Sequence, residues 1–423
     1  MAPTVIGMLG LGNVGTGVVE YLLSDRRKPG QIYLKMAAVQ DLGKKRGARA
    51  RLTTDPYRII DDPEIKIVVE IMGGEEPARE YIMQSLERGK SVVTANKVLI
   101  AKYGREIFDA ARRKGVDVFF EGAVAGGVPV IRVMRESLSA NQISRILAIL
   151  NGTTNYILTR QSEEMSYDEA LKDAQSRGFA EANSELDVSG RDARDKLAIL
   201  ASLAFDTPVD PDKIYCEGIT GIASEDIDYA AEEGLSVKLL GVAKRRGNTL
   251  ELRVHPTLIP QNHPLAGVRY EYNAVYLEGD LCGPQMYYGR GAGRKPTTSA
   301  VLSDIFRAAR NKERGVSDSL PELRSSLRIV GPEKVRTRGY FRMNLKHVPG
   351  TLSAVTGVFG SHGIQVEDSI QRRKYRRRIG REEVFPNIIT IEETPEAVIQ
   401  KALEELSALD RVVGTPVYIR IEQ

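Results

Sequence analysis

The chain of 423 residues has a formal net charge of +4 and is 42% hydrophobic, which is enough for two or three domains, each with its own core. So small a net charge gives no general reason to expect binding to nucleic acid or to a membrane surface, and no stretch approaches about eighteen uninterrupted apolar residues. Two cysteines, Cys216 and Cys282, and an amino terminus without a basic start and apolar run are typical of a reduced, cytoplasmic protein.

The first predicted strand, residues 5–9, runs directly into the sequence GLGNVG, and a helical pattern of apolar residues follows. Gly10 permits the tight turn, Gly12 lets the backbone approach a pyrophosphate, and Gly15 lets the helix pack closely on the strand. A strand before the glycines and a helix after them favour a dinucleotide site over a chance glycine-rich loop. The residues that we expect to contact a cofactor here are Gly10, Gly12, Asn13, Val14 and Gly15.

A second predicted strand, residues 32–39, bears on the choice of cofactor because Asp41 follows it. An acidic residue at this distance from the glycines typically binds the ribose 2′-hydroxyl of NAD. Lys44, Lys45 and Arg46 come next, and basic residues there suit the 2′-phosphate of NADP. Asp41 and Lys44 are both candidate cofactor residues, and the sequence leaves NAD and NADP open.

The next elements complete a doubly wound parallel sheet of the Rossmann type. Strands are predicted at 65–71, 91–95 and 116–120, and helices at 77–88 and 102–114. Asn96 and Lys97 follow the strand at 91–95, at the sheet edge where ligands of α/β proteins bind. Lys97 is therefore a candidate for contact with cofactor or substrate; the alternative is a solvated lysine after a strand.

The loop from Glu121 to Pro129 is rich in small residues and lies beside the same predicted edge. Its backbone carbonyls, with the Glu121 carboxylate, are the oxygen ligands that a hard cation prefers. The alternative is a plain glycine-rich connection.

Carboxylates and a lysine gather at the start of a predicted helix between Gly178 and Leu200. Ser189 and Asp192 have the S-x-x-D spacing of a helix start, so we expect Ser189 to cap a helix that begins near Gly190. Asp192 and Lys196 lie four residues apart, where their side chains meet on a helix. The acidic residues that precede its positive end are Glu181, Glu185 and Asp187. This pattern predicts a reaction centre; the alternative is a surface ion pair of about 0.3–0.5 kcal/mol.

The middle of the chain predicts a mixed sheet with helices on one face. A strand at 143–150 leads into Asn151, a helix is expected at 235–245, and strands follow at 250–254 and 273–278. A helix at 299–310 is expected to return to the nucleotide-binding domain. His255 and His263 have no metal-ligand partner at useful spacing, so both are interpreted as structural.

The C-terminal part of the chain predicts a separate module. Residues 311–338 have the polar composition, with Gly and Pro, of a linker. Strands are then predicted at 340–345, 364–369, 387–391 and 412–421, and helices at 352–359 and 395–409, which is the βαββαβ order of a ferredoxin-like fold. The basic run Arg372 to Arg378 is interpreted as a solvated hairpin loop, with an acidic partner such as nucleic acid as the less favoured alternative.

The motifs of residues 4–330 resemble, in kind and in order, those of homoserine dehydrogenases. They are GLGNVG at 10–15, TANK at 94–97, NGTTNYIL at 151–158, HPLAGV at 263–268, NAV at 273–275 and GRGAG at 289–293. The resemblance implies reversible, NAD(P)-dependent reduction of L-aspartate 4-semialdehyde to L-homoserine, on the route to threonine, methionine and isoleucine. The C-terminal module, with Pro349-Gly350 before its first helix and Gly363-Ile364 after it, resembles an ACT domain, which implies feedback by threonine.

The resemblance also implies roles for single residues. Lys196 matches the general acid or base of the family, and Lys97 matches a lysine that contacts cofactor and substrate. Glu181 matches the residue that binds the substrate ammonium, and Asp187 and Asp192 match the other acidic positions. Further cofactor contacts are implied for Thr94, Gly291 and Gly293, and a sodium site for Glu121, Val124, Gly126 and Val128.

The chain departs from the family pattern at two places. Asn183 occupies a customary carboxylate position, so its effect on substrate affinity stays open. Arg290, Arg294 and Lys295 make the surroundings of the loop at Gly291 more basic than usual, and they face either cofactor phosphates or water.

Together these patterns predict an α/β chain of three domains. Residues 1–130, with 299–330 returning, form the dinucleotide-binding domain; 131–298 form an α+β domain for substrate binding and dimerisation; 311–338 are partly linker; and 339–423 form the ACT-like regulatory domain. The expected partners are a small-molecule substrate, a threonine effector and further copies of the chain in a homodimer or homotetramer, with no membrane.

Two other functions stay open at this stage. One is a related NAD(P)-dependent amino acid dehydrogenase, which Glu181 and the Asn155-Tyr156 pair oppose. The other is a non-catalytic sensor of cofactor and amino acid. Lys97 and Lys196 oppose the sensor, because a sensor needs no proton donor.

Overall fold

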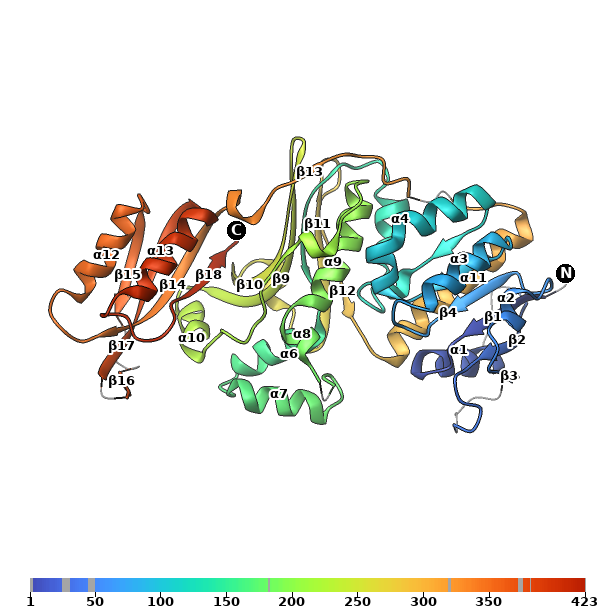
Figure 1. Cartoon of the computed structure of the whole chain (residues 1–423), viewed down its shortest axis with the longest axis horizontal. Helices are drawn as coiled ribbons and strands as arrows, with labels where there is room; N and C mark the ends of the chain where they lie inside the picture. The colour runs from blue at the N-terminus through green and yellow to red at the C-terminus, as the bar shows by residue number, and fades with distance from the viewer. Residues whose placement is uncertain are drawn as a thin grey trace. The chain divides into compact units, whose positions relative to one another are not determined.

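The computed structural model describes residues 3–24, 31–44, 50–181, 183–318, 321–371, 376–380 and 382–422 (Figure 1). The chain divides into two units. The first comprises Met1–Gly152, Asp192–Ile214 and Glu271–Leu327, and the second comprises Thr153–Arg191, Tyr215–Tyr270 and Arg328–Gln423. The described part of the chain contains no helix that is both long and apolar enough to cross a membrane. The cytoplasmic location and the domain boundaries predicted above stay predictions.

The first unit is built on a parallel sheet with the strand order β3-β2-β1-β4-β5-β6. Its strands are β1 (Thr4–Leu9), β2 (Ile32–Ala38), β3 (Leu52–Thr53), β4 (Ile67–Glu70), β5 (Ser91–Thr94) and β6 (Val118–Phe119). Every residue of β4 and β5 is buried, as expected for strands with helices on both faces. This order is that of the doubly wound dinucleotide-binding fold, which confirms the predicted architecture.

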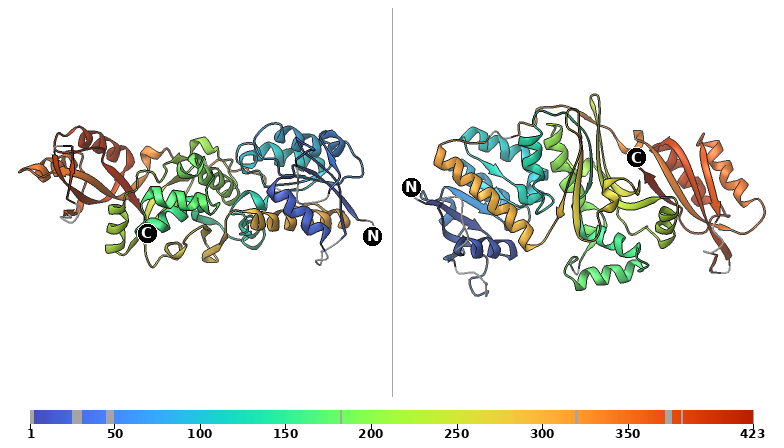
Figure 2. Two further views of the ribbon diagram at one scale, coloured as in Figure 1. Left: turned by 90° about the horizontal axis from the view of Figure 1, so that it is seen from below. Right: turned by 180° about the vertical axis from the view of Figure 1, so that it is seen from behind.

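Helices cover both faces of this sheet. The helices α1 (Asn13–Leu23) and α11 (Arg294–Arg314) pack on one face, where Val18 and Ile305 meet Met8 of β1. The other face carries α2 (Tyr57–Ile60), α3 (Ala78–Glu87) and α4 (Lys97–Lys114). Figure 1 shows α3 and α4 in front of the sheet, and Figure 2 shows α11 along its opposite face. As predicted, the chain returns to this sheet with a late helix.

The start of α4 differs from the prediction, which placed it at residue 102. The helix begins at Lys97, because the Asn96 side chain accepts a hydrogen bond from the backbone N–H of Leu99 at 3.4 Å and caps it. Lys97 is thus the first residue of a helix rather than part of a loop.

Three further strands of the first unit pair antiparallel in the order β12-β11-β7. They are β7 (Ile143–Ile149), β11 (Tyr272–Gly279) and β12 (Gly283–Arg290). The unit also contains α9 (Arg191–Ala204) and the short α5 (Val130–Arg132). The strands predicted at 143–150 and 273–278 are confirmed.

The second unit contains a long antiparallel hairpin. Its strands are β9 (Leu235–Arg246) and β10 (Thr249–Pro260), paired from Arg246 opposite Thr249 to Leu235 opposite Pro260. The helix predicted at 235–245 is therefore wrong. All residues from Val237 to Ala243 are buried, and a strand covered on both faces produces the same continuous apolar pattern as a buried helix. The unit also contains α6 (Gly152–Gln161), α7 (Tyr167–Ser176), α8 (Glu185–Val188), α10 (Ser224–Glu232) and β8 (Tyr215–Cys216).

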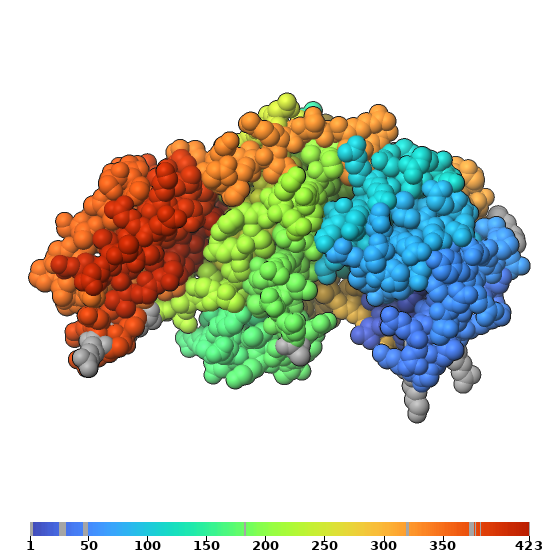
Figure 3. Space-filling view, in the orientation of Figure 1, coloured from blue at the N-terminus to red at the C-terminus, as the bar shows by residue number. Residues whose placement is uncertain are grey.

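The C-terminal module, defined here as residues 336–422, also belongs to the second unit. Its elements are β14 (Arg336–Lys346), α12 (Thr351–Ser361), β15 (Val366–Gln371), β16 (Arg377–Ile379), β17 (Glu382–Pro395), α13 (Glu396–Ala408) and β18 (Val417–Ile421). The four principal strands are antiparallel in the order β18-β14-β17-β15, and α12 and α13 pack on one face around Phe341 and Phe359. Figure 3 shows the outer surface of these helices in orange and dark red. The predicted ferredoxin-like order is confirmed.

The predicted linker and the basic run are only partly loops. Residues 311–314 continue α11, and Arg328–Ile329 form β13, which pairs with β10. Of the basic run, residues 372–375 lie outside the described residues, and Arg377–Ile379 form β16, which pairs with β17.

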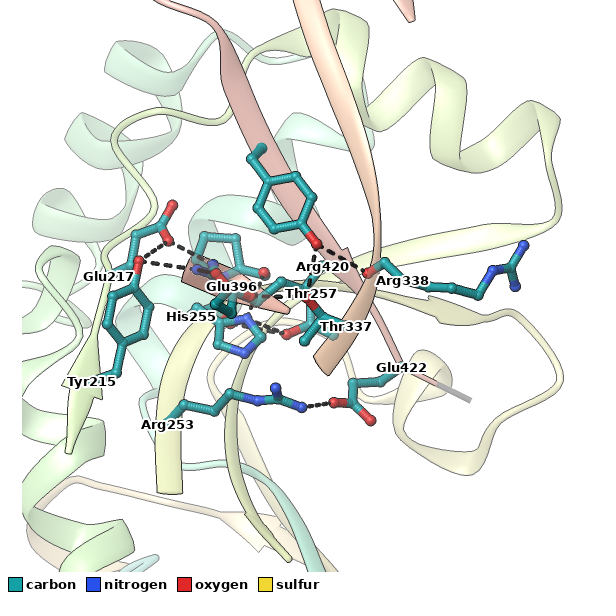
Figure 4. A network of polar contacts seen from close by, with 12 residues as sticks. Tyr215, Glu217, Arg253, His255, Thr257, Thr337, Arg338, Glu396, Arg420 and Glu422 are labelled. Carbon is teal, nitrogen blue, oxygen red and sulfur yellow. Dashed lines mark hydrogen bonds and ion pairs between the residues drawn. The ribbon is translucent and has the colours of Figure 1, made fainter. Parts of the chain in front are cut away.

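A buried polar junction joins the C-terminal module to β10 (Figure 4). Strand β18 runs parallel to β10, with Arg420 opposite Thr257. The Arg420 guanidinium, 3% exposed, donates to Glu396 at 2.7 Å and to Glu217 at 2.8 Å. Glu422 forms an ion pair with Arg253 of β10. Arg253, Arg420 and Glu422 are buried, so leaving any of these charges unpaired would be costly.

Candidate functional site

The glycine-rich turn between β1 and α1 has the geometry of a phosphate site. At Gly10 the backbone φ angle is 98°, and an added Cβ would lie 2.8 Å from the Ile71 carbonyl oxygen. At Gly15 an added Cβ would lie 3.0 Å from the Gly10 carbonyl oxygen, whereas at Gly12 it would meet nothing within 4 Å. Gly12 precedes the first residue of α1, Asn13, and Val14 follows on the same turn. Gly10 and Gly15 thus pack against other backbone atoms, whereas the space beside Gly12 is open. The N–H groups at the start of α1 favour an anion there.

The other predicted cofactor residues lie in two loops of the first unit. Asp41 follows β2, and its Oδ1 accepts a hydrogen bond from the Gly43 N–H at 2.7 Å; Lys44 is the last residue described before 45–49. Gly291 and Gly293 lie between β12 and α11, and Gly293 precedes the first residue of that helix. The basic residue Arg294 forms an ion pair with Glu20 of α1.

Lys97, Asp192 and Lys196 form one contact cluster within the first unit. Asp192 Oδ1 lies 2.8 Å from Lys97 Nζ, and Asp192 Oδ2 lies 2.6 Å from Lys196 Nζ. Lys196 is 8% exposed, and its Nζ also donates to the Leu150 carbonyl oxygen at 2.8 Å. The predicted contact between Asp192 and Lys196 is therefore present. Because Lys196 is buried, this contact is not the surface ion pair that the sequence left as the alternative.

The charge of Asp192 is set by its surroundings. Burial opposes ionisation of this carboxyl group, but Lys196 and Lys97 outweigh that effect and hold the pKa of Asp192 well below its usual range. The carboxylate is also hydrogen-bonded by the Asn151 side-chain amide, 2.9 Å from Asp192 Oδ2. Two ammonium groups and an amide thus converge on one anion.

The helix that carries Asp192 and Lys196 begins where expected but is not capped as expected. Helix α9 starts at Arg191, one residue after the predicted position. The Ser189 hydroxyl, which was predicted to cap it, donates instead to the Leu186 carbonyl oxygen at 3.4 Å. Ser189 thus closes the preceding helix, α8.

Sequence reasoning missed the contribution of Leu150 and Asn151. Leu150 offers only its carbonyl oxygen, which accepts from Lys196 and, at 2.9 Å, from the Asn273 side chain, and a backbone contact leaves no trace in residue type. Asn151 did carry a signal, since it is the first residue of the motif NGTTNYIL at 151–158. Asn273, in contact with Leu150, is buried.

Glu181 and Asp187 lie in the second unit. Asp187 is on α8, and its Oδ2 lies 3.2 Å from the Thr153 hydroxyl of α6. Glu181 is exposed, and its backbone carbonyl accepts from the Gln175 side chain at 3.3 Å. Asn183, the departure from the family pattern, accepts from the N–H of Glu185 at 3.1 Å and so helps to start α8.

The Glu121 carboxylate binds backbone N–H groups at the start of α5. Its two carboxylate oxygens accept from the N–H groups of Ile131 and Arg132, both at 2.9 Å. The backbone N–H of Glu121 donates to Asp304 of α11 at 2.8 Å. Burial, with the nearby Glu121 charge, raises the pKa of Asp304 to about 8. Within the described ranges, no group of three or more His, Cys, Asp or Glu is arranged to hold a metal ion.

The backbone of the same loop retains free acceptors. Among the described residues, no hydrogen bond is found to the carbonyl oxygens of Val124 and Gly126, and the Val128 carbonyl accepts one, from Val130 at 2.8 Å. An added Cβ at Gly126 would lie 2.5 Å from the Gly291 carbonyl oxygen, so this loop packs tightly on the loop after β12.

The two histidines are structural, as predicted. His255 is fully buried, with Nδ1 3.0 Å from the Thr257 hydroxyl, and His263 Nδ1 accepts from the N–H of Leu265 at 3.2 Å.

Comparisons with known proteins lead to one family. The family model for the NAD-binding domain of homoserine dehydrogenase matches residues 10–121, and that for homoserine dehydrogenase matches residues 129–306. The homoserine dehydrogenase of a Synechocystis species is 43% identical, over 98% of this chain and 99% of its own. A crystal structure of a homoserine dehydrogenase from Thiobacillus denitrificans, 41% identical, matches 100% of this chain and 99% of its own with a TM-score of 0.91.

A shorter relative bears on the cofactor. A hyperthermophilic archaeal homoserine dehydrogenase, solved in complex with NADPH, is 25% identical and covers 73% of this chain and 98% of its own, with a TM-score of 0.63. The NAD-binding domain and the end-to-end match to the longer relatives lead to one conclusion. The chain belongs to the homoserine dehydrogenase family, a family of NAD(P)-dependent oxidoreductases.

Proposed function

We propose that the protein interconverts L-aspartate 4-semialdehyde and L-homoserine, with Lys196 and Lys97 at the reacting end of the substrate. The observation that supports this most directly is the contact of both lysines, of which Lys196 is buried, with the carboxylate of Asp192. When bound, the nicotinamide cofactor supplies or accepts the hydride. The protein's own task is then to orient the substrate and to handle one proton.

Lys196 is proposed as the group that handles this proton. An ammonium group has three N–H bonds, and two of them are directed at the Leu150 carbonyl and at Asp192. Among the described residues, the third remains for the aldehyde or alkoxide oxygen of the substrate. During reduction Lys196 donates a proton to that oxygen, and during oxidation of homoserine it accepts one. Lys97 adds a second positive charge, which favours the forming alkoxide.

The amino acid end of the substrate is proposed to bind at Glu181 and Asp187. Both are carboxylates, and a carboxylate is the natural partner of the substrate ammonium. The hydrogen bond of Asn183 to the start of α8 explains how an amide is accommodated at a customary carboxylate position. The remaining carboxylates then carry the recognition of the ammonium.

The cofactor is proposed to lie along the carboxyl ends of β1, β4 and β5, over Gly10 to Gly15, with Thr94, Lys97, Gly291 and Gly293 beside it. Asp41 supports NAD, and Lys44 supports NADP. Both dinucleotides are therefore to be compared.

A monovalent cation such as sodium is proposed in the loop after η1 (Glu121–Ala123). The carbonyl oxygens of Val124 and Gly126, and the second lone pair of Val128, fit a hard cation, whereas the carboxylate of Glu121 is engaged by backbone N–H groups. Glu121 then shapes the loop rather than binding the ion through its side chain. Replacing sodium by choline is expected to lower the Tm, and Gly126→Ala is expected to remove that difference.

Two assembly properties are proposed on narrower grounds. Exposed Met286 (39%) and Tyr288 (52%) on β12 support a homodimer or homotetramer, which light scattering of the purified protein tests. The ferredoxin-like C-terminal module supports an ACT-type regulatory role with threonine as effector. Family membership and the paired lysines are against both alternatives, the non-catalytic sensor and a different amino acid dehydrogenase.

The decisive experiment is oxidation of L-homoserine by the purified protein, followed by nicotinamide absorbance with NAD and NADP separately, with and without threonine. Turnover with either dinucleotide, lost in Lys196→Ala, supports the proposal. Intact dinucleotide binding without turnover on homoserine contradicts it. A response to threonine tests the regulatory module independently of the chemistry.

A further inference from the structure

Glu70, the last residue of β4, is a buried carboxylate to which the proposed reaction gives no role. Its side chain has no exposed surface. Oε1 accepts hydrogen bonds from the N–H groups of Met72 at 2.8 Å and Gly73 at 3.4 Å, and Oε2 accepts one from the Thr94 hydroxyl at 2.6 Å. Burial raises the pKa of Glu70. Burying a carboxyl group costs free energy unless hydrogen-bond donors satisfy it, so the fold depends on these three donors staying in place.

The first arm of these contacts holds the turn after β4 beside the cofactor turn. The N–H of Ile71 donates to the Leu9 carbonyl at 2.9 Å, and an added Cβ at Gly10 would meet the Ile71 carbonyl oxygen at 2.8 Å. The strand order reverses between β1 and β4, and this reversal point is where dinucleotides bind in such sheets. A shift of the turn after β4 would therefore move the wall of the cofactor site.

The second arm leads to Lys97. The Thr94 hydroxyl accepts from the N–H of Asn96 at 2.9 Å, and the Asn96 side chain both caps α4 and donates to the Gly74 carbonyl at 2.8 Å. Lys97 is the first residue of that capped helix, and its Nζ contacts Asp192. Glu70, Thr94, Asn96 and the turn at Gly73–Gly74 thus form a closed ring of contacts beside Lys97, the first residue of α4.

We propose that Glu70 is a positioning residue, which locks the turn at Gly73–Gly74 to the first residue of α4. The cofactor edge and the Lys97 ammonium then keep a fixed spacing during turnover. This inference rests on the proposed role of Lys97.

The test uses Glu70→Gln, which has nearly the same shape and keeps one acceptor oxygen but places an amide NH₂ against Thr94. The kcat for homoserine oxidation is expected to fall about 10- to 100-fold, with little change in the KM of homoserine, because misplacement affects the reacting geometry. Thr94→Val is expected to reproduce the loss, and Thr94→Ser, which keeps the hydroxyl, to restore most of the rate. If Glu70→Gln does not fold, this Thr94 pair decides, provided that both Thr94 variants bind the dinucleotide with wild-type affinity; a weakened dinucleotide affinity in Thr94→Val overturns the inference.

A double-mutant cycle shows whether Glu70 acts through Lys97. In a Lys97→Met background Glu70→Gln is expected to lower kcat several-fold less than in the wild-type background, because the route through Lys97 is removed and only the route through the cofactor turn remains. An equal loss in both backgrounds, or a wild-type kcat for Glu70→Gln, overturns the inference. A wild-type kcat for Lys97→Met alone overturns the role of Lys97 in the proposed function and the inference with it.

Asp117→Asn is the matched control. Asp117 is 1% exposed and precedes β6 at the amino end of the same sheet, where it accepts from the Asp318 N–H at 2.7 Å and from Asn311 at 3.1 Å. Its substitution is expected to lower the Tm and to leave kcat unchanged, which separates positioning from general loss of stability.

Discussion

Lys97 and Lys196 each hold one oxygen of the same carboxylate, that of Asp192, at 2.8 and 2.6 Å. Two ammonium groups beside one carboxylate repel each other, and the anion between them offsets that repulsion. Lys97 is the first residue of α4, and Lys196 lies in the middle of α9, a helix far away in the sequence. The predictions below begin with this cluster.

Lys196→Ala is expected to lower kcat by about 10²–10⁴-fold, the usual contribution of a positioned acid or base. Steady-state oxidation of homoserine measures this, with binding of NADPH followed by fluorescence as the check on the fold. Lys213→Ala, at a side chain 70% exposed with only a 4.0 Å contact to Asp210, is the control and should behave as wild type. Near-normal turnover of Lys196→Ala would remove this residue from the mechanism.

Asp192→Asn is expected to change the acid stability of the protein. Because the pKa of Asp192 is lower in the folded than in the unfolded chain, its contribution to the free energy of unfolding is full above about pH 4 and is lost as the pH falls through the folded value. The difference between wild type and variant should thus shrink from pH 6 to pH 3. Urea unfolding at several pH values measures it, and a difference independent of pH contradicts the expectation.

Asp304→Asn is expected to change how the stability of the protein depends on pH between about pH 5 and pH 8. The folded chain keeps the proton of Asp304 up to about pH 8, whereas the unfolded chain loses it near pH 4, so wild-type stability falls with pH between these values. The slope from this group approaches about 1.4 kcal/mol per pH unit. The variant lacks the ionisable group but retains an oxygen that can accept from Glu121, and its Tm relative to wild type should therefore rise between pH 5 and pH 8. A constant difference would count against a raised pKa.

Glu181→Gln is expected to raise the KM of homoserine about 10- to 100-fold, which corresponds to about 1.5–3 kcal/mol for a hydrogen bond to a charged group. The affinity for NADPH should stay the same, because Glu181 is not among the residues proposed to bind the cofactor. Gln175→Ala, which removes the side chain that contacts the Glu181 backbone, controls for a shift of the loop. A lower kcat at an unchanged KM would assign Glu181 a different role.

The parts of the fold that sequence predicted well are those with a distinctive local pattern. The GLGNVG turn between an apolar strand and a helix has few alternative structures, and the alternation of strands and helices in the C-terminal module left one plausible order. The prediction of a helix at residues 235–245 was wrong because a strand that is buried on both faces lacks the alternation of apolar and polar residues that distinguishes a strand from a helix.

The candidate site was predicted in its residue types but not in its detailed contacts. Asp192 and Lys196 are four residues apart, so helical spacing sufficed to pair them. The contact of Lys97 with Asp192 spans many residues, and only the folded chain shows it. The carbonyl of Leu150 and the engagement of Glu121 by backbone N–H groups were likewise beyond a reading of side chains.

The buried junction around Arg420 joins residues that the ribosome adds at widely separated times. Arg253 and its partner Glu422 are 169 residues apart, and Arg420 is 203 residues from Glu217. At about 5–20 residues per second, roughly ten to forty seconds pass on the ribosome between the two halves of each pair. Until β18 has been made, Arg253 lacks Glu422 and Glu217 lacks Arg420, so this junction closes only after the last strand of the chain has been synthesised.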